Sequence, residues 1–117
     1  EGRYNVIAKI QIGKGGKTVI LNSHMDVVPA AEGWETDPYR LTIKNGRAYG
    51  RGSTDAKGCL TALLIAVKSI IENPDGINGN IIVTAVVDEE TYSKGTRYLI
   101  SHTTLKADYG IIGEPTL

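Results

Sequence analysis

The residues best suited to chemistry are one histidine and several carboxylates that follow apolar segments of the chain. His24 and Asp26 come directly after the apolar segment 18–22. An imidazole binds a metal through one ring nitrogen, and an aspartate nearby can hold the other ring N–H or the backbone behind it. Such a polar pair in a turn is more often structural. His24 is nevertheless a candidate metal ligand, and Asp26 is the candidate for orienting it.

Carboxylates occupy the same kind of position at other points of the chain. Residues 88–90 are three adjacent acids that end the apolar run 81–87, and Glu114 follows the segment 107–112. Adjacent carboxylates repel one another unless positive charge compensates. A solvated acidic loop is the alternative explanation for residues 88–90. Asp55 precedes an amphipathic stretch, where a helix N-cap would also explain an aspartate.

Hydrophobic periodicity predicts the strands that position these residues. Residues 4–12 alternate as a half-buried strand, and the glycine-rich segment 13–16 predicts a hairpin turn into a second strand over 17–22. Residues 41–49 read as another hairpin, turning at Asn45-Gly46. The runs 81–87 and 107–112 are almost continuously apolar, which is typical of strands buried on both faces of a parallel sheet.

Two helices are expected between these strands. The first covers residues 56–72 and the second about 94–101, with His102 as a structural residue at its C-terminal end. Leu99, with Tyr98 and Ile100, is expected to face inward from the second helix. The first helix should bury the stripe formed by Leu60, Leu63, Leu64, Val67, Ile70 and Ile71.

The alternation of strands and helices predicts an α/β fold with a mixed, mainly parallel sheet flanked by helices. Ligands of open α/β sheets bind at the carboxyl ends of the strands, so the polar residues above should meet there. That much negative charge is costly unless divalent cations neutralise it. Imidazole with carboxylates suits zinc, cobalt or manganese, and a carboxylate between two metals about 3.5–4 Å apart makes a hydrolytic site.

Composition excludes several other classes of protein. The 117 residues suffice for one domain, and 13 Lys+Arg balance 13 Asp+Glu, so there is no basic field for nucleic acid. No apolar run approaches the roughly 20 residues of a membrane span. The single cysteine, Cys59, cannot form an internal disulfide. We therefore expect a cytoplasmic protein without nucleic-acid or membrane partners.

Four motifs in this order and spacing resemble the acetylornithine deacetylase / succinyl-diaminopimelate desuccinylase family of zinc metallohydrolases, with its relatives aminoacylase-1 and carboxypeptidase G2. They are Ser-His-Met-Asp-Val-Val-Pro at 23–29, Gly-Arg-Gly-Ser-Thr-Asp-Ala-Lys-Gly at 50–58, Asp-Glu-Glu at 88–90 and Gly-Glu-Pro-Thr at 113–116. The resemblance covers nearly the whole chain. It implies a zinc-peptidase-like catalytic domain that cleaves the amide bond of an N-acyl amino acid or small peptide.

The resemblance also implies a role for each matched residue and two Zn²⁺ ions, which Co²⁺ or Mn²⁺ replaces in some members. Glu89 is the expected general base and acid, and Asp26 orients His24 from behind. The expected metal ligands are His24 and Glu114 on the first ion, Glu90 on the second, and Asp55 bridging both.

This chain departs from the family pattern in two respects. The family's second metal takes a histidine from later in the chain, and its lid and dimerisation domain is inserted after the Gly-Glu-Pro-Ser/Thr motif. Neither has a counterpart here. We therefore expect residues 1–117 to be the N-terminal portion of a catalytic domain, holding metal weakly and nearly inactive alone, from a full-length homodimer.

Other functions stay open. Carboxylate-rich strand ends also suit a two-metal phosphohydrolase, and a degenerate family member would be a non-catalytic binding domain. A nucleotide-binding module is disfavoured because no Gly-x-Gly-x-x-Gly follows a strand.

Overall fold

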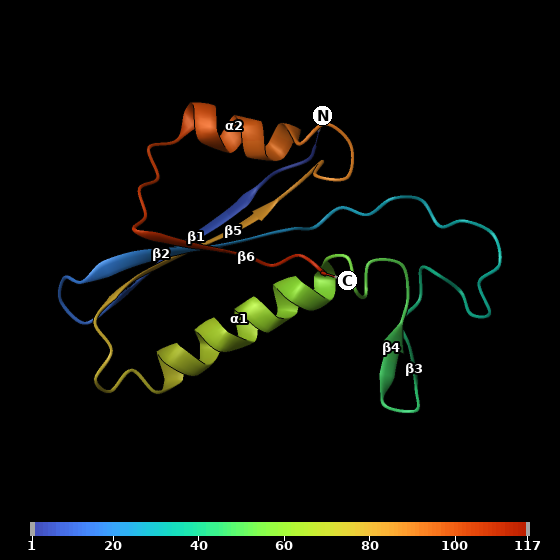
Figure 1. The fold of residues 1–117 in the computed structure, drawn as a ribbon, viewed down its shortest axis with the longest axis horizontal. Coiled ribbons are helices and arrows are strands. Elements are labelled where there is room, and N and C mark those ends of the chain that lie inside the picture. Colours follow the sequence, from blue (N-terminus) through green and yellow to red (C-terminus); the bar gives the residue numbers. More distant parts are fainter. Residues whose placement is uncertain (1, 117) are drawn as a thin grey trace.

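A computed structural model describes residues 2–116. A four-stranded sheet carries α1 and α2 on opposite sides, and a two-stranded hairpin stands apart from it (Figure 1). The predicted class, α/β with a mixed and mainly parallel sheet, is confirmed. The elements are β1 (Val6–Ile12), β2 (Lys17–His24), β3 (Thr42–Lys44), β4 (Arg47–Tyr49), α1 (Lys57–Glu72), β5 (Gly79–Val86), α2 (Lys94–His102) and β6 (Tyr109–Ile112).

The centre of the sheet is β5, which is buried along almost its whole length. The strand order is β1-β5-β2-β6, with β2 parallel to both β5 and β6 and β1 antiparallel to β5. Every residue of 81–86 is buried, as the continuous apolar run predicts for a strand that is paired on both edges. A core of Ile12, Leu21, Val67, Ile81 and Val83 forms where α1 packs on this sheet.

The predicted hairpin between the first two strands is wrong. β1 and β2 do not pair with each other, because β5 lies between them and pairs with both. The glycine-rich segment passes close over the start of β5, where a Cβ on Gly16 would lie 2.5 Å from the Asn78 carbonyl oxygen. Its glycines therefore leave room for β5. Inserting an apolar strand between two others buries more apolar surface than a local hairpin would.

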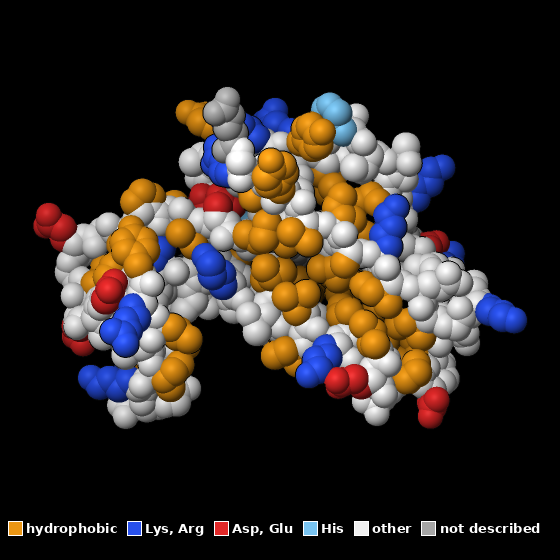
Figure 2. All heavy atoms as spheres, turned by 180° about the vertical axis from the view of Figure 1, so that it is seen from behind, with side chains coloured by type: hydrophobic (Ala, Val, Ile, Leu, Met, Phe, Trp, Pro, Cys, Tyr) orange, Lys and Arg blue, Asp and Glu red, His pale blue; other side chains and the backbone are white. Residues whose placement is uncertain are grey.

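The strand predicted over 107–112 forms as β6, but the expectation that it is buried is wrong. Among residues 2–116, β6 is an edge strand whose one partner is β2, and its large side chains Tyr109, Ile111 and Ile112 are 63%, 52% and 73% exposed. Figure 2 shows a broad apolar area across the middle of one face of the molecule. Within the described residues, the sheet is thus incompletely covered.

Both predicted helices form with narrower buried faces than expected. In α1, Val67 is buried and Leu63 is partly buried, whereas Leu64 and Ile71 are about half exposed. In α2 only Leu99 of the predicted apolar residues is buried, and the other two, Tyr98 and Ile100, are largely exposed.

The hairpin predicted over 41–49 is present as β3 and β4. Asn45 and Gly46 both have positive φ, 53° and 72°, as a type I′ turn requires. Neither helix described in residues 2–116 is long and apolar enough to cross a membrane.

Candidate metal centre

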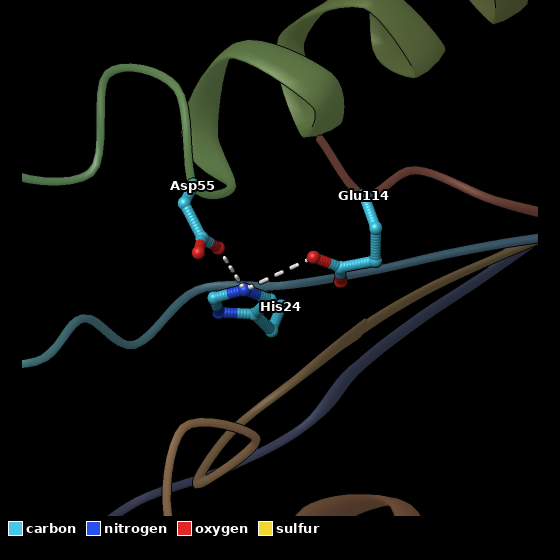
Figure 3. A group of neighbouring side chains, drawn as sticks. All are labelled: His24, Asp55 and Glu114. Atoms are coloured by element: carbon cyan, nitrogen blue, oxygen red, sulfur yellow. Dashed lines mark hydrogen bonds and ion pairs between the residues drawn. The ribbon is translucent and has the colours of Figure 1, made fainter. Parts of the chain in front are cut away.

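Three elements bring one histidine and two carboxylates together at one edge of the sheet (Figure 3). His24 is the last residue of β2, Glu114 follows the end of β6, and Asp55 lies just before α1. β2 and β6 are parallel, with Asn22 opposite Ile112, so their carboxyl ends lie at the same end of the sheet. The convergence predicted from the strand ends therefore occurs in the structure for these three residues.

Both carboxylates point at the same ring nitrogen. The His24 Nε2 atom lies 2.8 Å from Asp55 Oδ1 and 3.5 Å from Glu114 Oε2. One ligand atom from each of the three residues lies within 4.8 Å of the others. Zinc binds nitrogen and oxygen ligands at about 2.0–2.2 Å, so tetrahedral ligand atoms stand about 3.4 Å apart. The three donors fit one such ion.

The ring of His24 is held in one orientation. Its side chain is fully buried, and Nδ1 lies 3.0 Å from the main-chain carbonyl oxygen of Asp26. Because a carbonyl can only accept, Nδ1 carries a proton and donates it there. Nε2 then faces two carboxylates, an arrangement that needs a cation between them, either a proton or a metal. The donor set thus fits a bound cation.

The charges around this cluster shift two pKa values. Burial lowers the pKa of His24, but the hydrogen bond to Asp55 and the charges of Glu114 and Glu89 outweigh burial and raise it. Burial raises the pKa of Glu114, and the nearby negative charges of Glu89, Asp55 and Glu90 add to this, while His24 opposes it. The raised pKa of His24 thus reflects the negative charge around it, whereas that of Glu114 reflects burial first and the neighbouring carboxylates second.

The carboxylate of Asp26 holds the main chain of the 88–90 turn. Its Oδ1 accepts the main-chain N–H of Glu89 at 3.1 Å, and its Oδ2 accepts that of Glu90 at 3.2 Å. Its approach to His24 Nδ1, at 3.5 Å, is longer. Asp26 thus orients His24 through its carbonyl and fixes the 88–90 turn through its side chain. Those contacts span more than sixty residues of sequence, so no local pattern signals them.

Glu89 and Glu90 lie beside the cluster in different ways. Glu89 Oε2 is 3.9 Å from His24 Nε2, and its side chain is 43% exposed. Glu90 is half-buried, and its charge acts on Glu114, but it is not in the group of three converging donors found among residues 2–116. Three of the four predicted ligands therefore come together, and the place of Glu90 on a second metal stays a prediction.

The N-cap explanation of Asp55 does not hold. The cap of α1 is Ala56, and no side chain makes a cap hydrogen bond there. The Asp55 carboxylate is directed at His24 instead, and it is 49% exposed, so one side of the cluster faces solvent. His102, by contrast, stacks on Tyr98 with ring centroids 4.0 Å apart, in keeping with its expected structural role.

A buried serine, not singled out from the sequence, also touches the site. Ser23 is 1% exposed, and its Oγ donates to the Gly113 carbonyl at 2.8 Å. In the sequence it stands out only as the first residue of the motif at 23–29, next to His24.

A histidine and carboxylates gathered at the carboxyl end of an α/β sheet form a candidate metal centre of the kind that metal-dependent hydrolases use. The chain belongs to peptidase family M20/M25/M40, whose family model matches residues 20–117. This membership confirms the resemblance seen in the motifs and the predicted class, metal-dependent hydrolases.

Curated relatives include acetylornithine deacetylases. The chain is 41% identical over 117 residues to that of Aliivibrio salmonicida, a match covering 99% of this chain and 30% of that protein. It is 38% identical over 116 residues to that of Proteus mirabilis, covering 98% and 29%. The chain therefore spans less than a third of the length of these relatives.

Solved structures show the same fold. Human carnosine dipeptidase 1 superposes with a TM-score of 0.82 at 31% identity, over 97% of this chain and 26% of that one. The M20 family metallo-carboxypeptidase Sso-CP2 from Sulfolobus solfataricus gives a TM-score of 0.79 at 32% identity, with the same coverage of each chain.

Proposed function

We propose that the full-length protein is a di-metal amidohydrolase that cleaves the amide bond of an N-acyl amino acid or small peptide. The observation that carries this proposal is the convergence of Asp55 and Glu114 on one ring nitrogen of His24. The deacetylases and dipeptidase among its relatives support the substrate class. Residues 1–117 would be the N-terminal portion of its catalytic domain.

The chain's own residues account for one metal and part of another. His24, Asp55 and Glu114 would hold the first ion, and Asp55 with Glu90 would contribute to the second, completed by residues outside this chain. Zinc is the proposed ion, with cobalt or manganese as substitutes, because imidazole and carboxylates suit all three. When bound, such ions polarise a carbonyl group and lower the pKa of water.

Glu89 is the proposed general base and acid. Its carboxylate is partly exposed and lies 3.9 Å from His24 Nε2, and Glu89 belongs to the 88–90 turn that Asp26 holds through the Glu89 N–H. It would take a proton from the attacking water and pass it to the leaving amine nitrogen. Asp26 therefore serves both the ligand and the base by positioning them.

The cellular setting is also part of the proposal. A cytoplasmic enzyme of amino-acid biosynthesis agrees with the single cysteine and with the deacetylases among its relatives. We further propose a homodimer formed through a domain outside this chain, and no nucleic-acid partner, because its charges balance.

The test is a substrate panel on the full-length protein, with zinc, cobalt or manganese, before and after treatment with a chelator. The panel should hold acyl-amino acids, dipeptides and a phosphate monoester. We expect the protein to hydrolyse an acyl-amino acid or a dipeptide. The chelator should abolish this activity, and added metal should restore it. Turnover of the phosphate ester alone would favour the phosphohydrolase. Substrate binding without turnover of any panel member would favour a non-catalytic domain.

A further inference from the structure

We infer that Ser23 is a positioning residue of the metal centre: its hydroxyl, bonded to the Gly113 carbonyl, sets Glu114 in reach of His24. This inference rests on the proposed metal site, and it concerns a residue that is not itself a ligand.

The contact joins two ligand-bearing strand ends. Ser23 Oγ donates to the Gly113 carbonyl oxygen at 2.8 Å, and the Gly113 N–H donates to the Asn22 carbonyl oxygen at 2.7 Å. The regular pairing of β2 with β6 ends one residue earlier, at Asn22 and Ile112. Both polar groups of the Gly113 backbone are thus held by consecutive residues of β2, next to His24.

The other side of Gly113 is closed by α1. A Cβ placed on Gly113 would lie 2.9 Å from Leu63 Cδ1 and 3.4 Å from Cys59 Cβ. Gly113 is therefore enclosed between β2, which ends in His24, and α1, which Asp55 precedes. The backbone immediately before Glu114 meets both of the other ligand-bearing elements at this one residue.

Glu114 depends on this backbone more than its partners depend on theirs. The His24 ring is fixed by the Asp26 carbonyl, and Asp55 Oδ1 lies 2.8 Å from His24 Nε2. Within residues 2–116, no hydrogen bond reaches the Glu114 carboxylate, and the Glu114 side chain is 35% exposed. The bonds to Gly113 therefore fix the backbone from which the Glu114 side chain reaches to 3.5 Å from His24 Nε2.

Ser23 could instead be only a satisfied hydroxyl of the core, so the test needs a matched control. Thr84 on β5 is also fully buried, and its Oγ1 donates to the main-chain carbonyl of Leu21 at 3.4 Å. Thr84→Val removes that hydroxyl with little change of shape. Both Ser23→Ala and Thr84→Val should lower thermal stability, whereas only Ser23→Ala should alter the metal site.

The experiment measures zinc affinity by chelator competition, and the visible absorption of the Co²⁺-substituted form, in the full-length protein. For Ser23→Ala we expect affinity to fall about tenfold or more, as loss of groups behind a ligand typically causes, and the cobalt spectrum to change. Ser23→Thr keeps the donor, so it should retain the wild-type spectrum and affinity within about threefold even if its extra methyl group lowers the melting temperature.

Wild-type affinity and spectrum in a folded Ser23→Ala protein would overturn the inference while leaving the metal site intact. Equal losses of affinity in Ser23→Ala and Thr84→Val, or in Ser23→Ala and Ser23→Thr, would also overturn it. Failure of the wild-type protein to bind zinc or cobalt would overturn the proposed function as well, so the two failures are distinguishable.

Discussion

The Nδ1 atom of His24 and the main-chain carbonyl of Asp26 meet at 3.0 Å, and this contact decides which ring nitrogen faces the carboxylates. The side chain of Asp26 meanwhile holds the main chain of Glu89 and Glu90. One aspartate thus links the candidate ligand to the candidate base. The geometry of the site is set by contacts behind it as much as by the ligands themselves.

Glu89→Gln in the full-length protein should abolish hydrolysis, with kcat reduced at least about 10²-fold, because the amide cannot take a proton from water. Metal content should stay at the wild-type level, since Glu89 is not a proposed ligand. The measurement is kcat together with metal content after dialysis. Glu90→Gln is the matched control and should lose part of the metal. Wild-type turnover in Glu89→Gln would refute the assignment of the base.

Gly52→Ala should destabilise the loop that carries Asp55. Gly52 has φ +85°, and an added Cβ would lie 2.5 Å from Val27 Cγ1 and 2.9 Å from Lys57 Nζ. The left-handed backbone alone costs about 1–2 kcal/mol for a residue with a Cβ, and the crowding adds to this.

The control for that substitution is Gly33→Ala. Gly33 has a similar φ of +91°, but an added Cβ would meet nothing within 4 Å. Denaturant unfolding should therefore show a larger loss for Gly52→Ala, accompanied by weaker metal binding. Equal losses in the two variants would contradict the argument from crowding.

The ion pair of Lys17 and Asp108 should make stability depend on pH. The hydrogen bond from Lys17, at 2.8 Å, and then the Thr18 N–H hold the pKa of Asp108 below its usual value. The stabilisation is therefore present above the unfolded pKa of about 3.9 and is lost as pH falls through the folded pKa. Asp108→Asn should be less stable than wild type near neutral pH.

The difference in unfolding free energy between wild type and Asp108→Asn should shrink as the solution is acidified, in denaturant titrations across the acid range. Added salt should also reduce it, because the pair is exposed. A difference that is constant over the whole range would show that the ionised carboxylate is not the cause.

The outer edge of β6 should make the isolated 117-residue chain self-associate. β6 ends the described sheet, and Ile112 on it is 73% exposed. Unpaired apolar edges pair with other chains, and a lysine there opposes this. Ile112→Lys should lower the sedimentation coefficient seen at high concentration. Ile43→Lys, at a 66% exposed position on β3, should leave it unchanged. A wild-type chain that stays monomeric would contradict this prediction.

Residues with strong local patterns were predictable from the sequence. The apolar run of β5, the Asn45-Gly46 turn and the position of α1 each reflect local patterns in the chain. The rule that sites lie at the carboxyl ends of parallel strands then brought His24 and Glu114 together without knowledge of the strand order.

Features that depend on distant pairing were not predictable. The glycine-rich segment 13–16 has the composition of a hairpin turn, yet β5, more than sixty residues later, separates its two strands. The contact of Ser23 with Gly113 spans ninety residues, and that of Asp26 with Glu89 spans sixty-three. The sequence does not show whether a hydroxyl or carboxylate contacts solvent or a remote main-chain group.

The central claim, that His24, Asp55 and Glu114 bind one metal, is tested most directly by a crystal structure of the full-length protein grown with zinc. Anomalous scattering at the zinc edge locates the ion independently of the protein atoms. We predict a peak about 2.0–2.2 Å from His24 Nε2 and from one oxygen of each carboxylate. A fully occupied zinc elsewhere, with His24 Nε2 still bonded to Asp55 alone, would contradict the claim.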